Sequence, residues 1–165
     1  MPDNVAHNNL TLRPAHVGDL PALLALEAQF PGDRMSARQF RRHLRSATAR
    51  VQVALCDEML IGASLLFFRS GSRCARLYSL VVAASARGHG IGARLLADAE
   101  HGARGRGCQR LRLEVRVDNA AAIALYQRAG YLCFGEVPGY YHDGVAALRM
   151  HRDLQVSAAV LPVTA

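Results

Sequence analysis

Residues 113–131 read LEVRVDNAAAIALYQRAGY, and two structural periods meet within them. In the first half, apolar residues alternate with charged ones, which predicts a strand with one buried face. The alanine-rich run from Asn119 to Ala129 predicts a helix, and Gly130 is a residue that ends helices readily. A strand that passes directly into a helix indicates a sheet with helices packed on it.

The chain on either side of this stretch contains six further strand patterns and three helix patterns. Short alternating or β-branched runs between turn residues predict strands at 9–13, 51–56, 59–68, 76–82, 131–137 and 145–152. Helices are predicted from an Asp19 cap to about Phe30, from a Ser36–Gln39 capping box onward, and from Ile91 to 102–107. The resulting order, β-α-α-β-β-β-α-β-α-β-β, predicts a mixed sheet in an α/β (α+β) fold.

Composition limits the class of protein. The chain has 165 residues, of which 51% are hydrophobic and 20% charged, so we expect one domain over residues 1–153 and a tail at 154–165. No apolar run approaches 18 residues and the N-terminus has no leader pattern, so we expect a cytoplasmic protein without a membrane partner. The spacing of the four cysteines fits neither a metal site nor a redox motif, which predicts reduced thiols.

The charge of the chain is strongly positive. It has 20 basic residues against 13 acidic ones, a formal charge of +7, and every basic residue is an arginine. Such a surplus favours an anionic partner, which could be a nucleic acid, a membrane surface or a phosphorylated small molecule. The other explanation is codon bias, because a GC-rich genome favours arginine codons over lysine codons.

A glycine-rich turn, ARGHGIGA at residues 86–93, precedes the third predicted helix. Glycines at a helix start let the backbone approach an anion closely, and phosphate suits such a site. The spacing Gly88-x-Gly90-x-x-Ala93, with Glu114 about twenty residues on, matches the dinucleotide fingerprint. That interpretation is disfavoured, because five residues separate the first glycine from the strand before it, whereas the dinucleotide turn follows its strand almost directly.

The same turn contains Arg87-x-x-Gly90-x-Gly92, which resembles the coenzyme A pyrophosphate loop of the GNAT N-acetyltransferase superfamily. Residues 113–131 resemble the second half of a GNAT domain. Their LEVR and NAAAIALY segments, with the later YY pair at 140–141, are similar to RimI-type ribosomal-protein-alanine N-acetyltransferases. The similarity is continuous from about residue 80 to 131 and looser over 9–153. It implies the GNAT fold, a mixed central sheet of about seven strands with helices on both faces, and an acetyl-CoA-dependent N-acetyltransferase.

The resemblance also implies which residues hold acetyl-CoA, the expected cosubstrate, and it implies no metal. The backbone of the last strand residues before the turn would hold the pantetheine arm, the turn would cradle the pyrophosphate, and the start of the next helix would bond to the arm. These residues are Leu80, Val81 and Val82; Arg87, Gly88, His89, Gly90, Ile91, Gly92 and Ala93; and Asn119. From the residues alone, Arg87 is equally a solvated turn residue and Asn119 equally a helix N-cap.

Acetyl transfer to an amine makes two proton demands, one at the amine and one at the leaving thiolate. The resemblance gives Glu114 the role of general base, directly or through water, and Tyr126 the role of general acid. From the residues alone, Glu114 is an exposed acid paired with neighbouring arginines, which would weaken it as a base, and Tyr126 is a core aromatic. Tyr140 and Tyr141 either line the acceptor groove, as the resemblance implies, or cover the core. No serine or cysteine in these motifs is placed to accept an acetyl group, so we expect direct transfer in a ternary complex.

The expected acceptor is the α-amine of a protein or peptide N-terminus, ribosomal proteins included. With a pKa of roughly 7.7–8.0 this amine is partly neutral at cytoplasmic pH, whereas a lysine near roughly 10.4 is mostly charged. A lysine side chain or a small amine is the alternative acceptor. A non-catalytic, arginine-rich nucleic-acid binder is the alternative class, disfavoured by 6% aromatic residues and no tryptophan. The protein is expected to be a monomer or homodimer.

Overall fold

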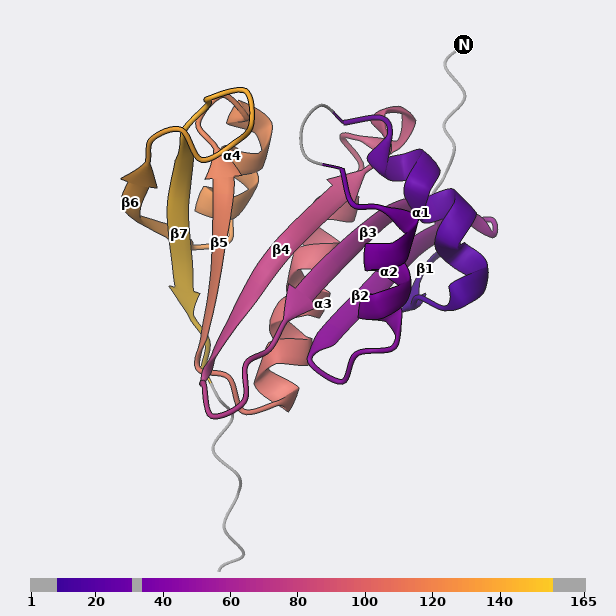
Figure 1. Cartoon of the computed structure of the whole chain (residues 1–165), viewed down its shortest axis with the longest axis horizontal. Helices are drawn as coiled ribbons and strands as arrows, with labels where there is room; N and C mark the ends of the chain where they lie inside the picture. Colours follow the sequence, from indigo (N-terminus) through magenta and orange to yellow (C-terminus); the bar gives the residue numbers. More distant parts are fainter. Residues whose placement is uncertain (1–8, 31–33, 156–165) are drawn as a thin grey trace, which may run out of the picture.

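The structure is a computed structural model that describes residues 9–30 and 34–155. Seven strands form one sheet in the order β1-β2-β3-β4-β5-β7-β6. The strands are β1 Leu10–Pro14, β2 Ala49–Cys56, β3 Met59–Phe67, β4 Cys74–Val82, β5 Arg110–Arg116, β6 Leu132–Val137 and β7 Ala147–Asp153. The helices are α1 Leu20–Glu27, α2 Ala37–Leu44, α3 Ile91–Gly105 and α4 Ala120–Arg128. The predicted order of elements is confirmed, and helices lie on both faces of the sheet (Figure 1).

The sheet divides between β4 and β5, which is the only parallel pair among the strands of the described residues. The two strands pair only from Cys74 with Arg110 to Leu77 with Leu113. Beyond that point β4 continues to Val82 and β5 to Arg116 without further pairing to each other. Figure 1 shows β4 and β5 close together where they begin and diverging toward their ends. The sheet therefore consists of a half with β1–β4 and a half with β5, β7 and β6.

An irregularity in β4 accompanies this divergence. In the β3–β4 pair, Ser79 lies opposite Leu65 but Leu77 lies opposite Leu66, so Tyr78 is the extra residue of a bulge. A bulge bends its strand and increases its twist, and here it falls directly after the last residue that pairs with β5. The bulge thus marks the point where β4 turns away from β5, and the Tyr78 side chain is exposed there.

Two hydrophobic cores lie against the sheet. They do not follow its two halves strictly, because Leu66 of β3 and Leu77 of β4 belong to the same core as β5 and β7. One core joins α1, α2 and the start of α3 to β2 and β3, and includes Leu23, Phe40 and Leu65. The other joins α3 and α4 to β5 and β7, and includes Leu96 and Leu113. Leu80 packs against both cores, so the unpaired end of β4 runs along the boundary between them.

Some local predictions are confirmed and one is wrong. The Ser36–Gln39 capping box forms, with hydrogen bonds of 3.2 and 2.8 Å. Asp19 does not cap α1: its carboxylate pairs with Arg13 at 2.7 Å and accepts the His16 backbone N–H at 2.9 Å. A 3-10 turn at Val17–Asp19 runs straight into α1, so the first helical N–H groups do not face this side chain.

Two predicted boundaries differ from the observed ones, at the end of the first helix and at the end of the domain. The helix α1 stops at Glu27, before the predicted end at Phe30, and the predicted break at 31–33 lies outside the described residues. The backbone N–H of Leu154 donates to Gln109 at 2.7 Å and its side chain is buried, so the fold continues one residue past 153. Residues 156–165 of the predicted tail lie outside the described residues.

Candidate active site

The glycine turn before α3 uses its glycines for two different reasons. Gly88 and Gly90 have φ values of +81° and +77°, in the left-handed region that favours glycine, and nothing lies within 4 Å of an added Cβ. Gly92 has no such φ, but an added Cβ would lie 3.3 Å from Leu125 of α4. Two of the glycines therefore shape the turn, and the third lets the first turn of α3 approach the other half of the sheet.

The turn and the unpaired end of β4 face one space. An added Cβ at Gly92 would also lie 3.8 Å from Leu80 and 3.9 Å from Val82. The α3 helix begins at Ile91, so its first backbone N–H groups have no intrahelical acceptor. The structure thus brings together the predicted coenzyme residues of β4 and of the turn, at the end of the sheet where β4 and β5 separate.

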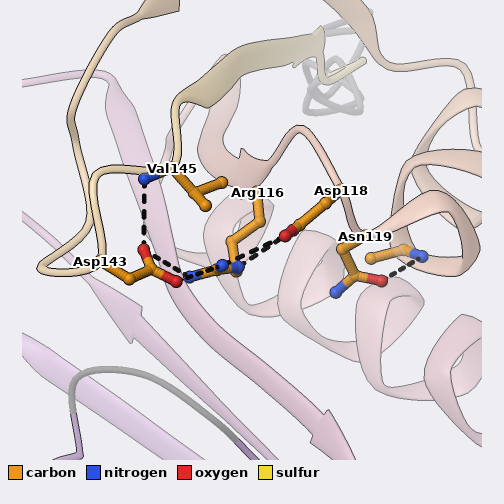
Figure 2. A network of polar contacts seen from close by, with 6 residues as sticks. Arg116, Asp118, Asn119, Asp143 and Val145 are labelled. Atoms are coloured by element: carbon orange, nitrogen blue, oxygen red, sulfur yellow. Dashed lines mark hydrogen bonds and ion pairs between the residues drawn. The ribbon is translucent and has the colours of Figure 1, made fainter.

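Three other predicted coenzyme residues have contacts of their own. Arg87 is exposed and lies over the Phe30 ring at 5.2 Å from its centroid. His89 is exposed, with Nδ1 3.3 Å from the Ala86 carbonyl oxygen. Asn119 accepts the Ala122 N–H at 3.1 Å through Oδ1, which is the N-cap geometry and leaves its amide N–H groups available (Figure 2).

A cleft of about 340 Å³ lies on the open side of the divergence. Its lining comes from both halves of the sheet and from the α1–α2 region, and includes Glu114, Tyr140 and Tyr141 among the predicted residues. Residues on three separate segments, β5, the β6–β7 connection and β4, therefore meet around one space. Within residues 9–30 and 34–155, no group of three or more His, Cys, Asp or Glu side chains is arranged to hold a metal ion.

Glu114 lies at the floor of this cleft, and its side chain is 7% exposed. Its Oε2 accepts a hydrogen bond from Arg76 Nε at 3.0 Å, and its Oε1 accepts one from Arg112 at 3.2 Å. Arg149 Nε lies 3.9 Å from Oε1, beyond hydrogen-bond distance. An ionised carboxylate has about four lone-pair sites, so two hydrogen bonds leave Glu114 able to accept a proton or a water.

Tyr126 does not line the cleft but lies in the core of the second half, 6% exposed. Its ring centroid is 5.8 Å from that of Tyr131. Burial raises the pKa of Tyr126 well above its usual value near 10, with a smaller contribution from the phenol of Tyr141. The phenol therefore keeps its proton throughout the physiological pH range and is a hydrogen-bond donor.

The two loop tyrosines are held by arginines. Arg76 donates to the Tyr140 hydroxyl at 2.8 Å, and Arg116 lies 4.9 Å from the centroid of the Tyr141 ring. Burial raises the pKa of Tyr141 to about 12, so this phenol is also protonated at neutral pH. The pair lines the cleft rather than covering the core, which is the arrangement that an acceptor groove requires.

Arg116 fixes the loop that carries these tyrosines to the end of β5 (Figure 2). Its guanidinium donates to Asp118 at 3.0 and 3.2 Å and to Asp143 at 3.3 and 2.6 Å. Asp143 also accepts the Val145 N–H at 3.2 Å. These hydrogen bonds raise the pKa of Arg116 and lower the pKa values of both aspartates, so all three groups stay charged at neutral pH.

Several cleft residues are not apparent from the sequence motifs. They include Glu27 at the end of α1 and Arg76 and Tyr78 on β4. Burial raises the pKa of Glu27, while the Met35 backbone and Arg34 act in the opposite direction. The available signal for Arg76 is its charge within an otherwise apolar strand, but nothing local in sequence shows that it meets Glu114, 38 residues away.

Comparison with known proteins gives a consistent result. The acetyltransferase (GNAT) family matches residues 20–131. N-alpha-acetyltransferase 30 of Schizosaccharomyces pombe is 31% identical over 100 residues, which cover 59% of this chain and 67% of that protein.

Two solved structures share the fold. The ribosomal-protein-alanine N-acetyltransferase of Brucella melitensis superposes with a TM-score of 0.76 at 27% identity, covering 87% of this chain and 99% of that one. The ribosomal-protein-S18-alanine N-acetyltransferase of Escherichia coli superposes with a TM-score of 0.80 at 24% identity, covering 92% and 98%. At that lower identity the likeness is one of fold.

Proposed function

This chain belongs to the acetyltransferase (GNAT) family and is an acetyl-CoA-dependent N-acetyltransferase, and we propose that its acceptor is the α-amine of a protein or peptide N-terminus. The observation that carries the proposal is the divergence of β4 from β5, which has a glycine turn at one side and a cleft floored by Glu114 at the other. Such an arrangement lets two substrates enter from opposite sides and meet between the strands.

The chain has suitable groups to hold the coenzyme. We propose that the backbone of Leu80, Val81 and Val82, which has no β5 partner, bonds to the pantetheine arm. The free N–H groups at the start of α3, within the turn Arg87–Ala93, suit the pyrophosphate because a helix N-terminus carries partial positive charge. The available amide N–H groups of Asn119 suit an acceptor on the arm.

Glu114 is the proposed general base. The coenzyme supplies an acetyl thioester, and the residues of the chain supply the two proton transfers. An α-amine with a pKa of roughly 7.7–8.0 is mostly protonated near pH 7, so it must give up a proton before or during its attack on the thioester. Glu114 can act with its remaining lone pairs, directly or through a water, while Arg76 and Arg112 hold the carboxylate in position by hydrogen bonds of 3.0 and 3.2 Å.

Tyr126 is the proposed general acid. The raised pKa of Tyr126 keeps its phenol protonated. A hydrogen bond from this buried phenol to the developing thiolate of the coenzyme is stronger than one in water, because little water competes for it. Ser79 is the one serine or cysteine among the described residues that line the cleft, and no histidine lies in the lining to activate it as a nucleophile. We therefore propose direct attack of the amine in a ternary complex.

Further parts of the proposal concern the acceptor and the setting of the reaction. The relatives named for N-terminal acetylation support an α-amine over the alternatives, a lysine side chain or a small amine.

No described helix is long and apolar enough to cross a bilayer. The four cysteines are free thiols, which supports a reducing compartment such as the cytoplasm. A ribosomal protein as acceptor, and a monomeric or homodimeric state, belong to the proposal as well.

The proposal is tested by incubating the protein with acetyl-CoA and a panel of N-terminal peptides, lysine peptides and polyamines, and following the release of coenzyme thiol. We expect release with N-terminal peptides and much less with the other amines. Preference for a lysine peptide or a polyamine would overturn the acceptor. Silence across the panel, with salt-dependent binding to nucleic acid instead, would overturn the role of the chain as an enzyme.

A further inference from the structure

Three arginines from three strands surround the single carboxylate of Glu114. Arg76 comes from β4, Arg112 from β5 and Arg149 from β7, and we call them the arginine triad. The β5–β7 register places Glu114 opposite Arg149, and the two arginines that hydrogen-bond to Glu114 do so at 3.0 and 3.2 Å. The triad therefore brings three positive charges to one negative charge.

Other ion pairs of the described fold have fewer arginines for each carboxylate. Arg104 and Arg152 share Glu100, at 4.0 and 3.0 Å. Arg13 pairs with Asp19, Arg50 with Asp98 and Arg110 with Asp153, one carboxylate for each guanidinium. Arg116 has two carboxylates to itself. The triad has one carboxylate for three guanidiniums, which leaves a local surplus of about two positive charges when no other acid contributes.

One member of the triad also has an unused donor. Arg149 Nε is buried and has no hydrogen-bond acceptor among the described residues, since Glu114 Oε1 is 3.9 Å away. Its guanidinium lies 5.5 Å from the centroid of the Phe134 ring, a contact that supplies no acceptor oxygen. A buried donor without an acceptor is costly in free energy. The Arg149 side chain as a whole is 40% exposed, so a ligand oxygen meets the guanidinium on its exposed part and not at the buried Nε.

The surplus lies beside the cleft. Arg76 lines the cleft, whereas Arg112 and Arg149 lie next to it around Glu114, with side chains 36% and 40% exposed. Arg76 and Glu114 both line the cleft, and Arg76 also donates to Tyr140, which lines it too. The amine of an acceptor gains nothing from extra positive charge, so a substrate that benefits must carry negative charge elsewhere. Farther along β5, Arg116 with Asp118 and Asp143 has the opposite balance, so charge changes sign along this strand.

We infer that the acceptor is an acidic N-terminal segment, whose side-chain carboxylates at the second to fourth positions bind the arginine triad while its α-amine lies beside Glu114. This inference rests on the proposed function and adds its substrate class. Bidentate geometry makes arginine the side chain best suited to carboxylates. The order of charge along β5 directs the carboxylates toward Arg112 and Arg149, away from Asp118 and Asp143.

The test uses three peptides that begin with alanine and continue with three glutamates, three glutamines or three arginines. Thiol release from acetyl-CoA gives kcat/KM for each, and the full-length protein is used. We expect the glutamate peptide to exceed the glutamine peptide by about tenfold, and the arginine peptide to be poorest. The preference should shrink at high salt, because part of the cleft is open to solvent.

Variants assign the preference to the triad. In Arg112→Gln and Arg149→Gln the ratio of glutamate to glutamine peptide should fall to about twofold or less. A change in the base or in folding would lower both rates together and leave this ratio intact. Arg110→Gln is the matched control, because Arg110 lies on the same strand but pairs with the exposed Asp153 at 2.7 Å, and its ratio should stay near tenfold.

The outcomes separate the two proposals. Equal rates with all three peptides, or a preference for the arginine peptide, would overturn the acidic acceptor while leaving N-terminal acetylation in place. An unchanged ratio in both triad variants would do the same. No thiol release with any peptide would instead count against the proposed function itself.

Discussion

In β3, six consecutive residues from Ile61 to Leu66 are buried, whereas in β5 buried and partly exposed residues alternate. The difference follows from what covers each half of the sheet. The β1–β4 half has α1 and α2 on one face and α3 on the other, while no described helix covers the second face of β5 and β7 (Figure 1). A strand covered on both faces must be apolar throughout, but a strand with an open face can carry charge. The open half is therefore where Glu114 and its arginines are placed, and the covered half supplies stability.

The largest expected effect on stability comes from a core substitution in the covered half. Leu65 is 2% exposed in the centre of β3, so Leu65→Ala should lower the free energy of unfolding by about 2–5 kcal/mol, through lost burial and a cavity. Urea denaturation measures this, and kcat should be unchanged where the variant is folded. Leu132→Ala on β6 is the matched control, because Leu132 is 68% exposed and should cost less than about 0.5 kcal/mol. Equal losses would contradict the assignment of Leu65 to the core that stabilises the fold.

A substitution in the open half should lower the rate of the reaction and not the stability of the fold. Glu114→Gln removes the proposed base but keeps the shape of the side chain, and kcat/KM should fall by roughly 100-fold to 1000-fold. Coenzyme affinity, measured by calorimetry, should stay within about twofold because Glu114 is not assigned to the coenzyme. Glu136→Gln, an exposed acid on β6, is the control and should keep full activity. Full activity in Glu114→Gln would remove the base from this position.

Tyr126→Phe tests the proposed general acid of the second half. Loss of the phenol should lower kcat by roughly 30-fold to 100-fold with little change in stability. Because the pKa of Tyr126 is raised above its usual value, the wild-type rate should show no alkaline loss from this group below about pH 10. Tyr131→Phe is the matched control: its hydroxyl donates to Glu100 at 3.1 Å, so it should lose stability and keep kcat. Wild-type turnover in Tyr126→Phe would contradict the acid role.

The glycine turn joins the two halves and gives a smaller effect. Gly90→Ala places a side chain at a φ of +77° and should raise the KM for acetyl-CoA by about tenfold, with kcat nearly unchanged. Gly71→Ala is the matched control. Gly71 has a similar φ of +74°, but it lies in the turn between β3 and β4, so its substitution imposes similar strain away from the glycine turn before α3. If both variants raised KM alike, strain rather than coenzyme binding would explain the effect.

The smallest expected effect concerns two acids of the covered half, the half-buried Glu27 and the buried Asp19. Burial raises the pKa of Glu27, so its ionisation opposes folding as pH rises above its unfolded value of roughly 4.3. Glu27→Gln should therefore raise the free energy of unfolding at pH 7 by less than about 1 kcal/mol, an advantage lost in acid. Arg13 lowers the pKa of Asp19, so that acid stabilises above roughly pH 3.9 and Asp19→Asn should destabilise at pH 7. Urea denaturation at pH 7 and in acid tests both signs, and a loss in Glu27→Gln would contradict them.

Much of the fold could be predicted because its signals are local. The alternation in β5, the Ser36–Gln39 capping box and the glycine turn each depend on residues close in sequence. The Asp19 cap was wrong because Arg13, on another element, competes for the same carboxylate. Local patterns cannot reveal such competition.

The site could be predicted only in part for the same reason. Glu114, Tyr140 and Tyr141 are brought together in one cleft, as the motifs suggest. The meeting of Arg76 and Arg149 with Glu114 depends on the pairing of β4, β5 and β7, which single-sequence patterns do not specify. Glu27 enters the cleft from the end of α1, through packing between layers. The roles of Glu114 and Tyr126 in catalysis stay predictions.

The proposed reaction is direct attack of an amine on the thioester between the two halves of the sheet. Initial rates of thiol release, measured while acetyl-CoA and an N-terminal peptide are both varied, test this most directly. A ternary complex predicts double-reciprocal lines that intersect. Parallel lines would show an acetylated enzyme intermediate and contradict direct attack.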